Sequence, residues 1–227
     1  MNRLPLEGKV LKENDRIAQE LRQLYDTHGV LCLNLVSSPG SGKTSLLERT
    51  LEHFPAGERV AVLTGDIQTE NDAKRLRRFG FPVQQITTGG TCHLDARMIQ
   101  RALEKWRLQD LDLLLVENVG NLVCPSSYDL GEAAKVVVLS VTEGEDKPLK
   151  YPAMFFKSEL MILNKTDLLP YVPFEVEKAV ENARRVHPNM DVIKTSCVTG
   201  EGLPEWWQWL ADRKDRFGAA RVTAPVA

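Results

Sequence analysis

One segment of the chain combines small residues, a lysine and a hydroxyl at the spacing that binds phosphate. Ser37-Ser38-Pro39-Gly40-Ser41-Gly42-Lys43-Thr44 follows an apolar run and precedes a helical pattern, which is the context that a P-loop requires. Small residues let backbone N–H groups converge on phosphate oxygens at a helix N-terminus. We expect Lys43 to contact the β- and γ-phosphates and Thr44 to bind Mg²⁺, and the alternative is a glycine-rich turn before a helix. The predicted phosphate-binding residues are Gly40, Ser41, Gly42, Lys43, Thr44 and Ser45, and the strict pattern would place glycine where Ser37 stands.

Two acids end other apolar runs. Glu117 ends Leu113–Glu117 and can hold a magnesium-bound water, with Gly120 close to the γ-phosphate. Asp66 follows Thr64-Gly65 and is a third oxygen ligand or a water-orienting group. We therefore predict Lys43, Asp66 and Glu117 as catalytic residues, and Thr44, Asp66 and Glu117 as magnesium ligands. The alternative for both acids is helix capping or an ordinary loop carboxylate.

A tetrapeptide further along the chain is suited to reading a guanine base. In Asn164-Lys165-Thr166-Asp167, the carboxylate of Asp167 can accept hydrogen bonds from guanine N1–H and the exocyclic amine, which adenine does not offer. The stem of Lys165 can cover the base, and Asn164 can tie this loop to the P-loop. Near the C-terminus, the loop containing Ser196, Cys197 and Val198 can bring a backbone N–H to guanine O6. The predicted ligand is GTP or GDP.

Three further side chains have the chemistry of a metal site. Cys92 and His93 are adjacent, and Cys124 precedes Pro125 just after the Glu117 strand. Thiolates and imidazole suit Ni²⁺ or Zn²⁺. Three ligands are one short of a closed tetrahedral site, so the fourth would be water or would come across a dimer interface. The alternative, which the residue types alone favour, is two buried cysteines and a capping histidine.

The elements that must position these residues alternate along the chain. Helical patterns separate most of the near-continuous apolar runs, which predicts an α/β fold of three layers, a P-loop NTPase fold with a mostly parallel central sheet and helices on both faces. Ligands of such sheets lie beyond the carboxyl ends of the strands, where all the motifs fall. We predict an N-terminal helical segment in 1–28, packed on a G domain in 29–215 that contains the metal site, and a flexible tail in 216–227. The predicted helix covers 14–28, with Ile17, Leu21 and Leu24 on one face, and the predicted strands are 30–36, 59–63, 83–87, 111–116, 135–141, 160–163 and 192–195.

Composition excludes several other functions. The 227 residues include 29 basic and 31 acidic side chains, so no basic excess argues for nucleic acid. No apolar run approaches the roughly 20 residues that cross a bilayer, and the first residues lack the layout of a signal peptide. We expect a cytoplasmic protein. Its cysteines form no Cys-x-x-Cys pair; Cys32 lies in an apolar run and is expected in the core, and the role of Cys197 stays open.

Taken together, these stretches resemble the HypB family, GTPases of the SIMIBI class that assist nickel insertion into nickel–iron hydrogenases. The resemblance runs from about residue 13 to 210, and its specific stretches are 38–44, 90–96, 117–125 and 144–148. It implies that Cys92, His93 and Cys124 bind nickel or zinc at or near a GTP-dependent dimer interface, which reverses the preference for buried cysteines. It also implies that Ser37 is normal for the family and that Lys147 approaches the nucleotide of the partner subunit.

The resemblance predicts a GTP-hydrolysing metallochaperone. Its implied partners are a nickel-binding maturation protein of the HypA family and the hydrogenase large-subunit precursor, with no nucleic acid and no membrane. No arginine finger or glutamine is evident in the sequence, so we expect slow, partner-dependent turnover. The chain lacks the N-terminal Cys-x-x-Cys-Gly-Cys motif and the histidine-rich stretch of some relatives, and we expect no tight nickel storage there. The alternatives are a urease-accessory GTPase, whose metal motif is Cys-Pro-His, and a small-molecule P-loop kinase, which has no use for Asn-Lys-Thr-Asp.

Overall fold

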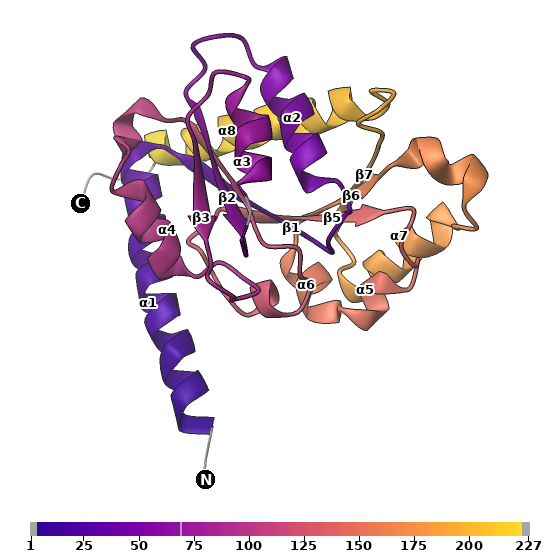
Figure 1. Cartoon of the computed structure of the whole chain (residues 1–227), viewed down its shortest axis with the longest axis horizontal. Helices are drawn as coiled ribbons and strands as arrows, with labels where there is room; N and C mark the ends of the chain where they lie inside the picture. Colours follow the sequence, from indigo (N-terminus) through magenta and orange to yellow (C-terminus); the bar gives the residue numbers. More distant parts are fainter. Residues whose placement is uncertain (1–3, 69, 224–227) are drawn as a thin grey trace.

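A single seven-stranded sheet forms the centre of the molecule (Figure 1). The computed structural model describes residues 4–68 and 70–223. All neighbouring strands are parallel, in the order β3-β2-β4-β1-β5-β6-β7. The strands are β1 (Leu31–Ser37), β2 (Val60–Asp66), β3 (Val83–Thr87), β4 (Leu113–Glu117), β5 (Ala134–Ser140), β6 (Leu160–Asn164) and β7 (Asp191–Thr195). The predicted strands are thus confirmed, with ends that move by up to three residues.

Helices cover both faces of this sheet, as the near-continuous apolar strands require. On one face lie α2 (Lys43–His53), α3 (Asn71–Arg77) and α8 (Leu203–Thr223), and on the other lie α1 (Leu4–His28), α4 (Ala96–Leu103), α5 (Lys147–Lys150), α6 (Pro152–Lys157) and α7 (Val176–Val186) (Figure 1). Alternate residues of β1 serve the two faces, because Leu33 packs beneath α2 and α8 whereas Cys32 packs beneath α1 and α4. The predicted three-layer architecture and the core position of Cys32 are confirmed.

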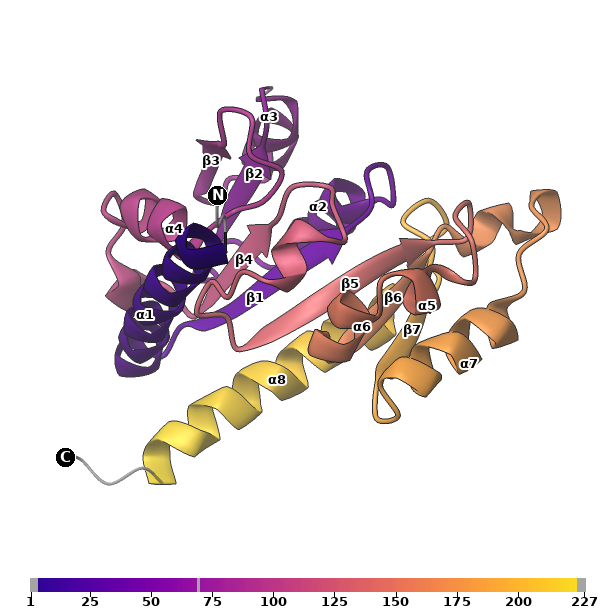
Figure 2. The same ribbon diagram turned by 90° about the horizontal axis from the view of Figure 1, so that it is seen from below.

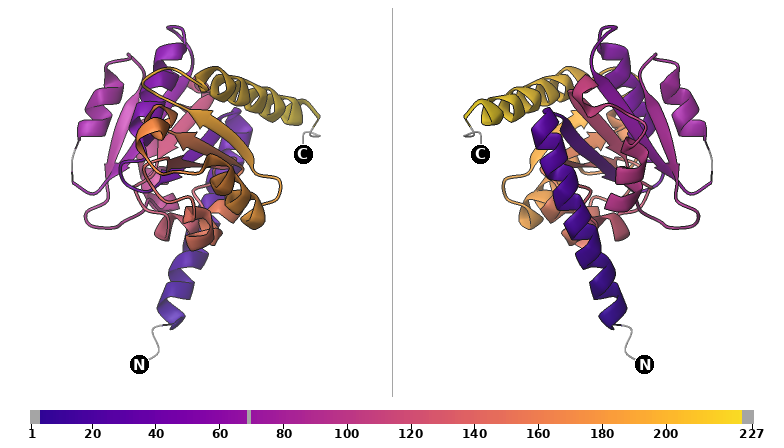
Figure 3. Two further views of the ribbon diagram at one scale, coloured as in Figure 1. Left: turned by 90° about the vertical axis from the view of Figure 1, so that its right-hand side faces the viewer. Right: turned by 90° about the vertical axis from the view of Figure 1, so that its left-hand side faces the viewer.

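Helix α1 is longer than its sequence pattern predicts. It begins at Leu4, and its N-terminal part projects beyond the sheet (Figure 3). Ile17, Leu21 and Tyr25 bury their side chains against α4, but Leu24 is 39% exposed, so its predicted place on the inner face is wrong. The step of three residues from Leu21 to Leu24 turns the helix by 300°, whereas the step of four residues from Leu21 to Tyr25 returns to the buried stripe. Residues 1–3 of the predicted segment lie outside the described residues.

The C-terminal segment also departs from the prediction. Helix α8 continues to Thr223 and lies along one side of the molecule (Figure 2), so residues 216–223 of the predicted tail are helical, and the flexibility of the tail stays a prediction. Residues 224–227, the end of the predicted tail, lie outside the described part of the chain. Buried Trp206 and Leu210 attach the first half of the helix to the core, and this anchored start lets helical hydrogen bonding continue past the last apolar contacts. No helix in 4–68 or 70–223 has the length and apolar character to cross a bilayer.

Candidate functional site

The P-loop forms the connection between β1 and α2. Lys43 and Thr44 are the first residues of α2 and are 7% and 8% exposed. The ammonium of Lys43 donates to Ser37 Oγ at 2.7 Å, and the Thr44 hydroxyl donates to Glu117 Oε1 at 2.7 Å. The lysine is therefore held over its own loop, by the serine that stands in the position of the first P-loop glycine.

The carboxyl group of Glu117 has a pKa that is shifted far from its ordinary value. Burial raises its pKa to about 7, against the lowering effect of Lys43 and of the hydrogen bond from Thr44. Burial also lowers the pKa of Lys43. Of the two carboxylate oxygens of Glu117, Oε2 is buried and has no hydrogen-bond partner among the described residues. A buried carboxylate oxygen beside the hydroxyl of Thr44 fits a Mg²⁺ ion, which prefers oxygen ligands.

A cleft of about 500 Å³ brings the predicted phosphate and magnesium residues together, except for Ser41, which is buried and does not line it. Its wall contains Gly40, Gly42, Lys43, Thr44, Ser45, Asp66, Glu117, Gly120 and Lys165. Gly120 lies directly against the P-loop, because a Cβ atom on it would be 3.0 Å from the backbone of Pro39. Asp66 is the last residue of β2, and its position in the wall places the end of that strand at the cleft. Its backbone carbonyl accepts from Thr88 N at 3.0 Å.

Two residues of α3 that the sequence motifs do not single out also line this cleft. They are Asp72 and Arg75. The guanidinium of Arg75 donates to Glu48 Oε2 at 2.6 Å and to Ser45 Oγ at 3.3 Å. The sequence gives no arginine signal here, because α3 is a short amphipathic helix whose basic residues resemble a solvated face. The structure therefore supplies a positive charge at the cleft that the motif analysis missed.

The predicted guanine loop lies against the P-loop. Asn164 Nδ2 donates to Ser41 O at 2.9 Å and Lys165 Nζ donates to Gly40 O at 2.7 Å. Gly42 has a φ of 100°, and a Cβ atom there would lie 2.3 Å from Asn164 Nδ2. Glycine is thus required for the left-handed turn and for the approach of the asparagine. The predicted tie between the two loops is present.

A second loop orients the acid of the tetrapeptide. Ser196 Oγ donates to Asp167 Oδ1 at 2.6 Å and accepts from the backbone N–H groups of Val198 and Thr199. Cys197 is half-buried, its thiol donates to Asn164 Oδ1 at 3.5 Å, and burial raises its pKa to about 11. The side chain of Val198 is 81% exposed, so this residue has only its backbone to offer the site.

Lys147 lies at the P-loop of its own chain. Its ammonium donates to Ser38 Oγ at 3.4 Å and pairs with Glu143 Oε2 at 3.3 Å. Glu143 also accepts from Ser41 Oγ at 2.7 Å, so the pair is joined to the phosphate-binding loop. The approach of Lys147 to a partner's nucleotide stays a prediction.

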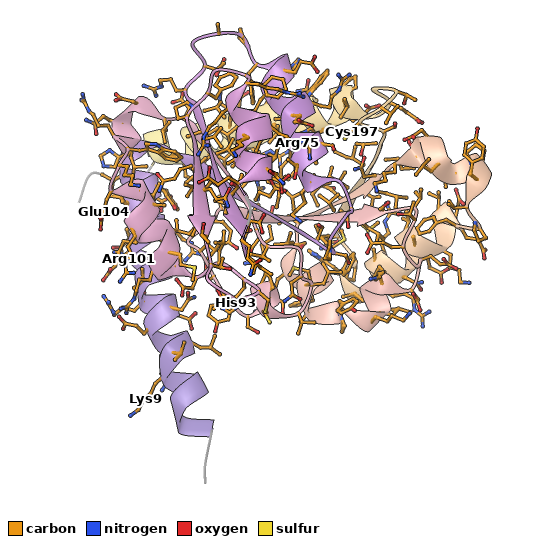
Figure 4. The ribbon with its side chains drawn as sticks, in the orientation of Figure 1. Lys9, Arg75, His93, Arg101, Glu104 and Cys197 are labelled. Atoms are coloured by element: carbon orange, nitrogen blue, oxygen red, sulfur yellow. The ribbon has the colours of Figure 1, made fainter. Side chains whose placement is uncertain are left out.

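The three predicted metal ligands come together in space. One ligand atom from each of Cys92, His93 and Cys124 lies within 4.8 Å of the others, and the two sulfur atoms are 3.0 Å apart. All three residues are partly exposed. His93 lies on the other side of the sheet from Arg75 and Cys197, as the labelled positions in Figure 4 show. Two thiols and an imidazole at this separation can chelate one soft or borderline divalent ion.

An aromatic ring holds the histidine of this triad. The rings of His93 and Tyr128 are stacked, with centroids 3.8 Å apart and an interplanar angle of 27°. Desolvation lowers the pKa of His93, which favours the neutral imidazole that binds metals. The neighbouring thiol of Cys92 raises the pKa of Cys124. Asn121 Nδ2 donates to Cys92 O at 3.2 Å, so the two ligand-bearing loops are joined beside the metal triad.

Comparisons with known proteins agree with this arrangement. The model of the CobW/HypB/UreG nucleotide-binding domain matches residues 31–194. The hydrogenase maturation factor HypB of Azotobacter vinelandii is 53% identical over 223 residues, covering 97% of this chain and 73% of the relative. A hydrogenase/urease maturation factor HypB of Helicobacter hepaticus is 45% identical over 200 residues, covering 86% and 82%.

A solved structure gives the same result in three dimensions. The crystal structure of HypB from Helicobacter pylori in complex with nickel superimposes with a TM-score of 0.85 and 40% sequence identity, and it covers 90% of this chain and 96% of that one. Both the sequence and the fold are therefore shared over nearly the whole length. The chain belongs to the HypB family of hydrogenase maturation factors, within the wider CobW/HypB/UreG group of nucleotide-binding domains.

Proposed function

We propose that this protein is a GTPase that couples GTP hydrolysis to nickel delivery during hydrogenase maturation. The observation that carries the proposal is the meeting of three loops at one sheet edge: the P-loop, the guanine loop bound to it through Asn164, and the segment that leads from Glu117 to Cys124. Membership of the HypB family supports the same reaction and cargo. Nickel is the cargo here, with Zn²⁺ as a competing ion for the same ligands.

The proposed reaction is transfer of the γ-phosphoryl group of GTP to water. Lys43 and the P-loop amides stabilise negative charge on the transferring group, and Asp66 orients the water. Thr44, Glu117 and Asp66 would hold Mg²⁺ through their side-chain oxygens, and the ion would supply positive charge beside the phosphates. Arg75 lines the cleft, but its guanidinium is paired with Glu48. It would add positive charge at the phosphates only after a partner or a second copy changes that arrangement, so we expect slow turnover in the free protein.

We infer the partners from the same family membership. They are a second copy of this chain, a nickel-binding protein of the HypA family and the hydrogenase large-subunit precursor, in the cytoplasm. The half-exposed metal triad supports such transfer, because a ligand set that lies at the surface can pass an ion directly to another protein. Size measurement with GDP, a GTP analogue and Ni²⁺ tests the dimer, and an unchanged size under all conditions contradicts it.

Nucleotide selection gives the sharpest test of the reaction. Phosphate release from GTP, ATP and xanthosine triphosphate is measured for the wild type, Asp167→Asn and Ser196→Ala. We expect GTP preference in the wild type and a change to xanthosine triphosphate in Asp167→Asn, because an amide can donate to the xanthine carbonyl that replaces the guanine amine. Ser196→Ala keeps the carboxylate and should weaken GTP use without any gain for xanthosine triphosphate. Preference for ATP in the wild type would favour a kinase instead.

A further inference from the structure

Strand β4 ends at Glu117, and consecutive side chains from there to Asn118 point to opposite sides of the sheet. Glu117 points to the face of α2, where it meets the Thr44 hydroxyl. Asn118 points to the other face, where it meets the backbone of the loop that carries Cys92 and His93. Glu117 and Asn118 both line the nucleotide cleft, and Asn118 in addition holds the loop that carries Cys92 and His93.

Asn118 is a buried junction between these regions. Its side-chain oxygen accepts from Leu94 N at 3.1 Å and from Val119 N at 3.0 Å, and the residue is 2% exposed. Leu94 follows His93 directly, and Val119 precedes Gly120. One amide oxygen thus joins the metal loop to the segment that approaches the γ-phosphate position. Without it, two buried N–H groups would lose their partner, which is costly in a protein interior.

A second asparagine fixes the orientation of this amide. Asn118 Nδ2 donates to Asn34 Oδ1 at 3.2 Å, and Asn34 is fully buried in the central strand β1. Asn34 Nδ2 in turn donates to Glu132 Oε1 at 3.2 Å, and Glu132 forms a buried ion pair with Lys135. The carboxylate of Glu132 can only accept, so it fixes the amide of Asn34, and Asn34 Oδ1 in turn fixes the amide of Asn118. If the Asn118 amide flipped, its NH₂ group would face the N–H groups of Leu94 and Val119, and these donors would have no acceptor.

Leu94 also contacts the strand of the other cleft acid. Its side chain is fully buried against Gly65, where a Cβ atom would be 2.8 Å from it. Gly65 immediately precedes Asp66. Packing this tight transmits small displacements, since neither partner has free space in which to absorb them. Leu94 is thereby linked to both strands that end at the phosphate cleft, by a hydrogen bond to Asn118 just after β4 and by packing on Gly65 of β2.

We propose that Asn118 is the positioning residue that couples nucleotide state to nickel affinity. The γ-phosphate acts on Gly120, which already lies against Pro39 of the P-loop. A displacement of Gly120 moves Val119 N, and the shared oxygen of Asn118 passes that movement to Leu94 N and so to Cys92 and His93. This inference rests on the proposed function, because it requires both GTP and nickel as ligands.

Asn14 provides a matched control. It is 5% exposed, its Oδ1 accepts from Ala96 N at 2.9 Å, and its Nδ2 donates to Asp129 O at 2.9 Å. Asn14 therefore holds the other end of the same loop through an identical chemical group, but it attaches the loop to α1 and not to β4. Replacing either asparagine loosens the loop, and only the Asn118 replacement cuts the route to the nucleotide.

The test compares Ni²⁺ dissociation constants, measured with GDP and with a non-hydrolysable GTP analogue, for the wild type, Asn118→Ala and Asn14→Ala. We expect the two constants of the wild type to differ about tenfold or more, within the range of measured couplings. Asn118→Ala should bring them within about twofold, and Asn14→Ala should weaken both and keep the wild-type ratio. A wild-type ratio retained in Asn118→Ala, or lost equally in both variants, overturns the inference.

Amide hydrogen exchange of the wild type decides the question if Asn118→Ala does not fold. Replacing GDP by the analogue should change exchange at Leu94 and Val119 together, because both donate to one oxygen. A change at Val119 with none at Leu94 overturns the inference. Phosphate release is measured on the same samples: hydrolysis of GTP without any wild-type nickel coupling overturns the inference but leaves the GTPase standing, and absence of hydrolysis refutes the proposed function itself.

Discussion

The nucleotide cleft and the metal triad lie on opposite sides of one sheet and are built by opposite means. Lys43, Thr44 and Glu117 are each less than a tenth exposed; Thr44 and Glu117 orient each other, and Ser37 holds Lys43. Cys92, His93 and Cys124 are partly exposed, and the side-chain amides of Asn121 and Asn118 hold the backbones of Cys92 and Leu94. A site for charge stabilisation gains from burial and rigidity. A site for cargo has to let its ion in and out.

This contrast teaches that the two sites need not share ligands to communicate. Asn118, which lines the cleft and holds the loop of Cys92 and His93, belongs to a buried network with Asn34 and Glu132, and such networks have few alternative arrangements. Mutations in the cleft should therefore change catalysis or stability, and mutations in the triad should change metal affinity. A cleft variant that lowered metal affinity, or a triad variant that slowed hydrolysis, would contradict this division.

The largest expected effect is on hydrolysis. Lys43→Ala removes the donor to the β- and γ-phosphates and should lower kcat for GTP by about 10²–10³-fold, the usual loss for one such donor. Ni²⁺ affinity with GDP bound should stay within about twofold of the wild type. Phosphate release and nickel titration measure the two quantities, with the exposed Lys105→Ala as the control. A comparable loss of nickel affinity would show that the sites are not separate.

Burial of Glu117 should cost stability in the protein free of nucleotide and magnesium. Its folded pKa of about 7 lies above the ordinary 4.5, so the folded state keeps a proton that the unfolded state releases. Stability therefore falls as the pH rises from 4.5 to 7, by up to about 3 kcal/mol. Glu117→Gln should be more stable than the wild type at pH 8 by about that amount, with the difference vanishing near pH 4.5. Urea unfolding at both pH values measures it, and a less stable variant at pH 8 contradicts the assignment.

Removal of one thiol should affect mainly the metal. Cys124→Ala is expected to weaken Ni²⁺ binding about 100-fold, at the upper end of losses from altered metal sites, and to abolish the thiolate-to-nickel absorption band. Cys197→Ala is the matched control, since that thiol contacts Asn164 on the nucleotide side and should leave nickel binding unchanged. Equal losses in the two variants would mean that Cys124 acts only through general stability.

The smallest expected effect comes from the ring beside the imidazole. Tyr128→Leu should weaken Ni²⁺ binding about 2–10-fold, equivalent to the roughly 0.5–1.5 kcal/mol of an aromatic pair. Tyr128→Phe keeps the stack on His93 and should remain within about twofold of the wild type. The shape of the nickel absorption spectrum reports whether the imidazole stays bound. Identical behaviour of the two variants would show that the stack does not position His93.

Much of this arrangement could be predicted from local sequence. The P-loop and the tie from Asn164 to Ser41 each follow from short patterns with a physical reason. The metal triad does not, because the residue types alone favoured buried cysteines and only the family resemblance pointed to the three side chains that the fold brings together. The reach of α1 to Leu4 and of α8 to Thr223 could not, because the anchoring contacts lie elsewhere along those helices. Asn34 and Asn118 were also invisible, since a polar residue inside an apolar run shows no partner until the fold supplies one.

The separation of the two cysteines has a consequence for biosynthesis. Cys92 and Cys124 are 32 positions apart, and the loop that bears Cys92 is fastened by β4, which is made in between. At about 5–20 residues per second, a ribosome releases the two thiols a few seconds apart. The nascent chain therefore offers an incomplete, unsupported ligand set until β4 has joined β1 and β2, which delays metal capture until about half of the chain has been made.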